Sequence, residues 1–194
     1  VFLFSLSISL LLLSSAALAE DWTQDATGGG GNPANGDASS MAAYGSQLYV
    51  GTENGPTGCE VWAHDGNNWS VLVGPGAPMP GGFNNVNNDR ASSMATYGGL
   101  LFVGTLNGTS GCEVWSFNGT TWNQVVGGGA PGSATAPGFG NVNNTDVYSM
   151  AVYDGQLYMG TDNGVDGCNV WRYDGTFLTQ VVGQGAVGTP TGPG

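Results

Sequence analysis

Short apolar stretches recur along the chain, and pairs or clusters of glycine, asparagine, aspartate and serine separate them. The turn pairs Gly98-Gly99 and Asp154-Gly155 suit two-residue hairpin turns, which need positive φ angles. Apolar residues occupy both faces of the inner stretches, as in LLFVG and EVW, so each sheet should be covered on both sides. Between residues 38 and 73 the pattern predicts four strands, at Ser40–Tyr44, Gln47–Thr52, Cys59–His64 and Trp69–Val73.

The same pattern occurs three times, at residues 38–73, 91–126 and 147–182. Met41, Met94 and Met150 head the three copies, which places them 53 and 56 residues apart. A period of this length without helical periodicity is typical of β-propeller blades rather than helical solenoids. The prediction is an all-β fold, a β-propeller of four-stranded blades.

The copies resemble kelch repeats in three places: the YGGLLFVGT hairpin, the VWRYDG run at residues 170–175, and the Trp69 and Trp122 that open the fourth strand. The double glycine that follows the second strand in kelch repeats is replaced here, as by Gly51-Thr52 in the first copy. The resemblance implies kelch-like blades over residues 38–182.

The predicted boundaries place a signal peptide at 1–19, an N-terminal strand and glycine-rich loop at 20–37, and blades at 38–90, 91–146 and 147–194. Residues 1–19 are apolar and end in Ala17-Leu18-Ala19, which resembles a signal-peptidase site. We therefore expect a secreted or cell-surface protein without a membrane span after cleavage. An N-terminal membrane anchor is the alternative interpretation.

The segment at Trp22 matches the fourth strand of the blades, so it is our candidate for a strand that closes a ring. The third copy stops before the GF-N portion that follows the other two. Because propellers have about 4–8 blades, we expect an incomplete ring. Further blades of the same parent chain would complete it, or arcs would assemble between chains.

The chain carries a formal charge of −12, with Arg90 and Arg172 as its only basic residues apart from one histidine. Such a surface repels phosphate backbones, which excludes direct nucleic-acid binding. Cys59, Cys112 and Cys168 hold one position in the repeat, so they should lie too far apart for a disulfide. We expect free, packed thiols and no metal bound by them.

Because connectors of an antiparallel meander alternate between its two ends, the loops between second and third strands share one rim with the connectors between blades. These loops carry amides and carboxylates that suit sugar hydroxyls. The alternative is that Asn-Gly supplies turn geometry and the connectors cap one another. The candidate ligand-binding residues on this rim are Asn54, Asn107, Asp162, Asn163, Asp166, Asn85, Asn88, Asp89, Asn141, Asn144 and Asp146.

No cofactor is expected, and a calcium site is considered only at Asp162 and Asp166. The loop DNGVDG supplies these two carboxylates, whereas the matching loop LNGTSG has none. Because Ca²⁺ takes six to eight oxygen ligands, a calcium site repeated in every blade is not expected.

Catalytic groups are sparse. The single histidine, His64, falls on the face opposite the candidate rim, and Glu60 and Glu113 sit at one repeat position that is Asn169 in the third copy. We therefore predict a binding module for extracellular glycan or protein. The alternatives are the propeller part of a secreted carbohydrate-active enzyme whose catalytic residues lie outside this chain, and a passive structural repeat.

Overall fold

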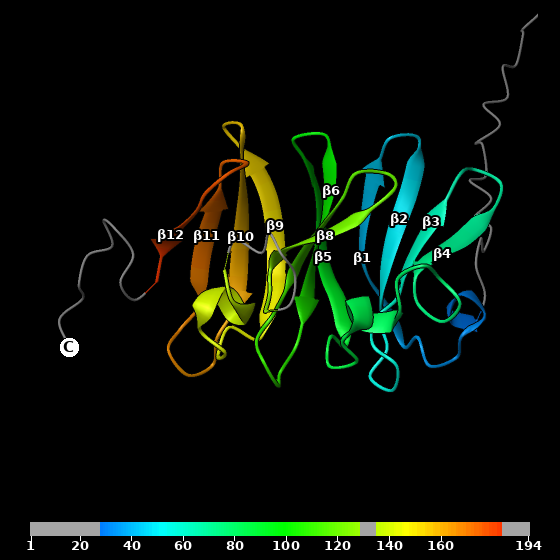
Figure 1. The fold of residues 1–194 in the computed structure, drawn as a ribbon, viewed down its shortest axis with the longest axis horizontal. Helices are drawn as coiled ribbons and strands as arrows, with labels where there is room; N and C mark the ends of the chain where they lie inside the picture. Colours follow the sequence, from blue (N-terminus) through cyan, green and yellow to red (C-terminus); the bar gives the residue numbers. More distant parts are fainter. Residues whose placement is uncertain (1–27, 129–134, 184–194) are drawn as a thin grey trace, which may run out of the picture.

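A computed structural model describes residues 28–128 and 135–183 of the chain, and this part is built from antiparallel β-strands and three short 3-10 turns (Figure 1). The all-β prediction is confirmed for these residues. The strands are β1 (Asp37–Tyr44), β2 (Gln47–Glu53), β3 (Val61–His64), β4 (Trp69–Val73), β5 (Arg90–Tyr97), β6 (Leu100–Leu106), β7 (Val114–Phe117), β8 (Trp122–Val126), β9 (Asp146–Tyr153), β10 (Gln156–Asp162), β11 (Asn169–Tyr173) and β12 (Leu178–Val182). The turns are η1 (Gly28–Gly31), η2 (Gly81–Asn84) and η3 (Pro137–Gly140).

Each sequence repeat forms one antiparallel meander of four strands, in the order β1–β4, β5–β8 and β9–β12. The observed strands of the first repeat match the predicted ones closely. Two boundaries differ by more than one residue: β1 begins at Asp37, three residues before the predicted Ser40, and β3 begins at Val61 rather than Cys59. The peptide group of Cys59 instead bonds to the connector that follows, because its N–H donates to Asn88 O and its carbonyl accepts from Gly82 N–H.

The turns form as their residues predict. Gly98 and Gly99 have φ angles of 57° and 76°, and Asp154 and Gly155 have 47° and 67°. The third hairpin of every meander is closed by a side chain. In the first, Asp65 Oδ1 accepts hydrogen bonds from the N–H groups of Asn67 and Asn68, and Asn118 and Asp174 do the same in the other two.

The meanders stack face to face, so the middle one is buried on both sides (Figure 1). Along β6, Leu101 and Val103 face the first meander and pack with Tyr49 and Val61. The residue between them, Phe102, points the other way into a second core shared with the third meander. The apolar residues on both faces of these strands therefore follow from a sheet with a neighbour on either side.

The three meanders are also joined at one end by single strand pairings, Glu53 with Arg90 and Leu106 with Asp146, which makes one twelve-stranded sheet. Nearby, a register shift in β1 frees the Ser40 hydroxyl to donate to Ala91 O of the next meander at 2.6 Å. These contacts fix how one meander sits on the next at the rim where the connectors lie.

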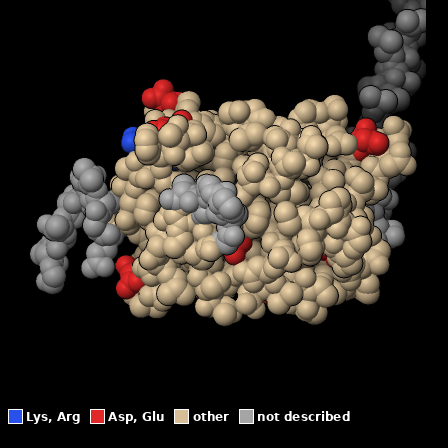
Figure 2. All heavy atoms as spheres, viewed as in Figure 1, with Lys and Arg blue, Asp and Glu red and all other residues tan. Residues whose placement is uncertain are grey.

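Charged side chains are few and separated on the face shown in Figure 2. No helix in the described part of the chain is long and apolar enough to span a membrane. Residues 1–27 and 184–194 lie outside the described residues, and with them the predicted signal peptide, the Trp22 strand and the end of the third repeat.

Candidate functional site

The loops that follow β2, β6 and β10 lie against the connectors between meanders, on the rim that the sequence predicts. Main-chain hydrogen bonds join the two groups. The N–H of Asn54 donates to Asp89 O at 2.7 Å, and the N–H of Asn107 donates to Thr145 O at the same distance in the next copy. The rim is therefore a continuous layer of loops rather than a set of separate fingers.

Five of the predicted ligand-binding residues, Asn54, Asn88, Asn107, Asn144 and Asn163, are buried in this layer. They hydrogen-bond across it. Asn54 Nδ2 donates to Asn35 Oδ1 at 2.9 Å, and the corresponding bonds join Asn107 to Asn88 and Asn163 to Asn144. In this arrangement the five amides hold loops to connectors, as in the alternative in which the connectors cap one another. The amide groups of these asparagines are therefore already used within the layer.

Residues 28–36, which were predicted to be part of a glycine-rich loop, form the same connector as the later copies. Gly29 and Gly30 have positive φ angles, as do Gly82 and Phe83 of η2. Asn32 and Asn35 take the places of Asn85 and Asn88. The shared spacing of these two asparagines is the sequence signal that could have identified this connector.

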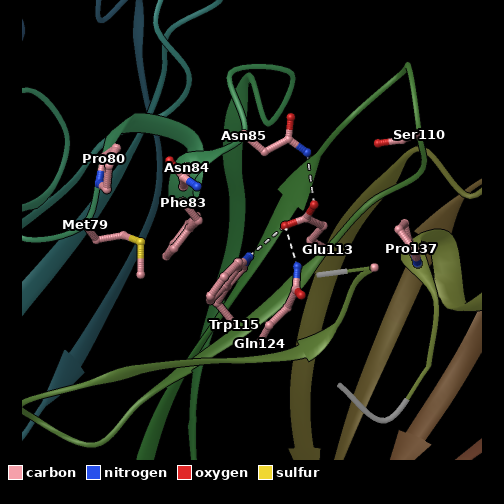
Figure 3. A pocket seen from close by; sticks show the side chains of 11 residues that line it. Met79, Pro80, Phe83, Asn84, Asn85, Ser110, Glu113, Trp115, Gln124 and Pro137 are labelled. Carbon is pink, nitrogen blue, oxygen red and sulfur yellow. Dashed lines mark hydrogen bonds between the residues drawn. The ribbon is translucent and has the colours of Figure 1, made fainter. Parts of the chain in front are cut away.

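A buried glutamate binds each of the first two connectors to its sheet. Glu113 Oε1 accepts from Asn85 Nδ2 at 3.0 Å. Its Oε2 accepts from Trp115 Nε1 and Gln124 Nε2 (Figure 3), and also from Asn88 Nδ2, at 2.9–3.0 Å. Every donor is neutral, so four N–H groups take the place of water around the carboxylate.

Glu60 makes the same arrangement with Asn32, Asn35 and Trp62. The pair of glutamates is therefore a framework element, with the carboxylates occupied by the connectors.

A cavity of about 590 Å³ lies beside Glu113, between η2, the loop after β6 and the start of η3 (Figure 3). Phe83 stacks on Trp115 along one wall, with ring centroids 5.0 Å apart and an interplanar angle of 11°. Trp115 and Phe83 are both buried. The cavity therefore offers edges of packed residues rather than an open aromatic platform.

The exposed end of the rim includes Asp162 and Asp166. Asp166 Oδ2 accepts from Asn141 Nδ2 at 3.0 Å and from Asn143 Nδ2 at 3.1 Å. These hydrogen bonds hold the pKa of Asp166 below its ordinary value. Among the described residues no group of three or more acidic, histidine or cysteine side chains is placed to hold a metal ion, so a calcium site here stays a prediction.

A more polar cavity, of about 410 Å³, lies where the chain enters β1, β5 and β9. Asp37, Arg90 and Asp146 are the first residues of these three strands and occupy one position of the repeat. The lining residues are Asp37, Ala38, Ser39, Arg90, Ser92, Asp146 and Tyr148.

Three oxygens of this polar cavity, Ser39 Oγ, Ser92 Oγ and Asp146 Oδ1, are buried without a well-formed hydrogen bond in the described part of the chain, although the Ser92 hydroxyl interacts with the Asp146 carboxyl. Asp146 is only 2% exposed, whereas Tyr148 is 71% exposed. A buried oxygen without a partner costs stability. The unmet hydrogen-bonding capacity therefore marks this cavity as the candidate site.

The charges around the polar cavity are unevenly balanced. Arg90 is ion-paired with Glu53. Burial raises the pKa of Asp146 above its ordinary value, and the charge of Asp162 adds to the rise, while the Ser92 hydroxyl and the Arg90 charge oppose it. Burial, with a contribution from Glu53, also raises the pKa of Asp89. The cavity thus carries more carboxylates than basic groups.

Sequence reasoning selected Asp146 as a connector residue but missed Asp37 and Arg90 at the same repeat position, and it missed Ser39 and Ser92 inside β1 and β5. One signal was available. The framework asparagines are identical in every copy. The residue that begins the first strand of each copy instead differs: it is aspartate in the first and third copies and arginine in the second.

Comparison with known proteins identifies no family. No family model matches the chain, and no curated protein matches it. Similar solved structures include two at 14% identity: GH43B of the Bacteroides ovatus xyloglucan PUL, over 77% of this chain with a TM-score of 0.41, and Trypanosoma rangeli sialidase, over 73% with a TM-score of 0.43. The matched region is 31% and 24% of those chains, so this chain covers less than two thirds of either.

Proposed function

We propose that this chain is an arc of a secreted or cell-surface β-propeller with kelch-like blades, and that it acts as a binding module for glycan. The face-to-face stacking of four-stranded meanders supports the architecture. The apolar residues 1–19 support export. Further blades of the same parent chain, or arcs contributed by other copies of the chain, would complete the ring.

The observation that carries the binding function is the set of polar-cavity oxygens on Ser39, Ser92 and Asp146 that lack a well-formed hydrogen bond in the described residues. A ligand with several hydroxyl groups can donate to the carboxylate and both donate to and accept from the serine hydroxyls. The exposed ring of Tyr148 adds a surface on which the apolar face of a sugar can pack.

The charges of the polar cavity favour a neutral ligand. A divalent cation would meet the Arg90 guanidinium, and an anion would meet Asp37, Asp146 and the Glu53 that already occupies Arg90. A neutral sugar avoids both penalties and can use all of these groups as hydrogen-bond partners. The proposed ligand class is therefore a neutral extracellular glycan, rather than a sialylated or sulfated one.

The test is a glycan array screened with the 194-residue chain, followed by calorimetric titration of the best neutral oligosaccharide. We expect Asp146→Asn and Ser92→Ala to weaken binding at least about tenfold, the loss of roughly one buried hydrogen bond to a charged or polar group. Asp166→Asn, on the same rim but outside the polar cavity, is the matched control and should bind normally.

A silent array, or binding that Asp166→Asn weakens and Asp146→Asn leaves unchanged, would overturn this assignment. Release of reducing sugar by the 194-residue chain would also overturn it, and would contradict the alternative in which the catalytic residues lie outside this chain.

A further inference from the structure

The two ends of the stack expose opposite halves of the same interface. Inside the stack, Leu101 of the second meander is 0% exposed because it packs on the first. Leu48, at the same position of the first meander, is 37% exposed. Met41, close by on the same meander, is 61% exposed. The outward face of β1–β4 is therefore a copy of a face that is buried elsewhere in this molecule.

The other end of the stack shows the complementary half. Cys59 and Cys112 are fully buried by the meander and connector that follow them, whereas Cys168 is exposed. Val61 and Val114 are likewise fully buried, and Val170 in the third copy is only half-buried. The outward face of β9–β12 thus has the shape that twice accepts a following meander.

Hydrogen bonds between successive meanders follow the same pattern. Cys59 N–H donates to Asn88 O and Cys112 N–H to Asn144 O, and the Ser40 and Ser93 hydroxyls donate to Ala91 O and Val147 O of the next meander. The third copies, Cys168 and Ser149, have no following meander in the described part of the chain.

The first meander already carries a connector, residues 28–36, that could accept the equivalent hydrogen bonds from another molecule. Asn35 is held in place by Glu60 and Asn54, as Asn88 is held by Glu113 and Asn107. If a second molecule were placed in the same register, the Cys168 N–H would donate to Asn35 O of that molecule, and the Ser149 hydroxyl would donate to its Ala38 O.

We propose that the outward face of β9–β12 docks the outward face of β1–β4 of a second copy of this chain, head to tail. We infer a second copy as the partner because the two internal interfaces join the same faces in the same order. A head-to-tail contact leaves one free face at each end, so it produces a ring if the rotation closes and a filament if it does not. This docking does not depend on the ligand proposed above.

Two differences between the amino-acid sequences of the repeats distinguish the proposed interface from the internal ones. Where Glu53 meets Arg90 inside the stack, the intermolecular contact brings Asp162 next to Asp37. Like charges at this point oppose docking. Arg172 stands where Ala63 and Ser116 are buried, so it also places a charge on the open face. The association should therefore be weaker than the internal contacts and should tighten when either charge is removed.

The experiment uses two variants of the 194-residue chain, each blocked at one end. Leu48→Glu puts a charge on the β1–β4 face, and Ser149→Glu puts one on the β9–β12 face at an exposed position. The wild type should increase in mean mass with concentration in analytical ultracentrifugation. Each variant alone should stay monomeric, while an equimolar mixture should form dimers and nothing larger, because one intact face of each kind remains.

Two further measurements complete the test. Asp37→Arg recreates the Glu53–Arg90 pairing against Asp162 and should strengthen wild-type association about tenfold. Circular dichroism and the unfolding midpoint establish that each variant is folded. A wild type that is monomeric at every concentration, a mixture that stays monomeric while the wild type associates, or single variants that associate like the wild type would each overturn the proposal.

Discussion

The second and third repeats have nearly the same strand pattern but different surroundings. The second, β5–β8, is covered on both faces, and its Glu113 is bound by four N–H donors. In the third, β9–β12, one face is open and Asn169 replaces the glutamate. Asn169 donates to Asn144 Oδ1 at 2.7 Å and accepts from Gln180 Nε2 at 2.5 Å.

The exchange of glutamate for asparagine changes what the neighbours can do. Trp115 Nε1 donates to Glu113, whereas Trp171 Nε1 is buried without a hydrogen-bond partner in the described residues. A single amide cannot accept from as many donors as a carboxylate. The comparison indicates that the glutamate with its N–H donors, here called the carboxylate clamp, adds stability to a repeat. The four strands form without it.

The largest expected effect tests the covered face. A Cβ at Gly104 would lie 2.5 Å from Val147 Cβ of the next meander, so Gly104→Ala must push two sheets apart. We expect it to lower the free energy of unfolding by about 2–3 kcal/mol. At the matched Gly160 the only close atom is the Ser149 hydroxyl oxygen, so Gly160→Ala should cost under about 1 kcal/mol. Urea denaturation measures both, and equal losses would contradict the covered-versus-open comparison.

The next effect tests the clamp. Glu113→Gln keeps the shape of the side chain but turns an amide N–H₂ toward existing donors, and we expect a loss of about 2 kcal/mol in the free energy of unfolding. Glu60→Gln, with three donors rather than four, should lose less. Thermal unfolding of both variants checks the order, and a Glu113→Gln protein as stable as the wild type would rule out the clamp as a stabilising feature.

The third repeat offers the reverse experiment. Asn169→Glu gives Trp171 Nε1, Gln180 Nε2 and Asn144 Nδ2 a common acceptor, and we expect a gain of roughly 0.5–1 kcal/mol in the free energy of unfolding. The gain should shrink when Trp171→Phe removes one donor, which a double-mutant cycle measures. Additive effects of the two substitutions would contradict the role assigned to Trp171.

The smallest effect compares the first residues of β5 and β9. Arg90 has Glu53 as partner, whereas the pKa of Asp146 is raised, chiefly by burial. Because the folded-state pKa is raised, ionising Asp146 costs stability as the pH rises from the ordinary aspartate pKa through the folded-state pKa. Asp146→Asn should remove this loss and stabilise the protein by up to about 1 kcal/mol at pH 7, while leaving stability at pH 3 almost unchanged.

Unfolding curves of Asp146→Asn at several pH values provide the measurement. A stability difference that is independent of pH would show that burial of the charge is not its cause. The same substitution should weaken glycan binding, since a binding group is often kept at a cost in stability.

The sequence predicted the meanders and the shared rim because both follow from local rules. Turn pairs such as Gly98-Gly99 set the hairpins, and the alternation of connectors places the loops of Asn54 and Asn107 at the end where the inter-repeat connectors lie. It did not predict that these two amides are buried. An asparagine in a loop has the same local signature whether it faces solvent or a connector 19 residues away.

The polar cavity was missed for a related reason. Asp37, Arg90 and Asp146 are more than 50 residues apart along the chain, and nothing local to any of them indicates a shared cavity. They meet because the single pairings Glu53 with Arg90 and Leu106 with Asp146 set the inner strands side by side at one end.

By itself, the sequence determined the strands, the turns and the threefold repeat, since these depend on side-chain periodicity and on residues that permit positive φ angles. Only the tertiary structure decided which polar groups are inside, which oxygens lack partners and which faces are uncovered. Those properties depend on how one sheet lies on the next, and the same repeat position is buried or exposed according to whether a neighbour follows it.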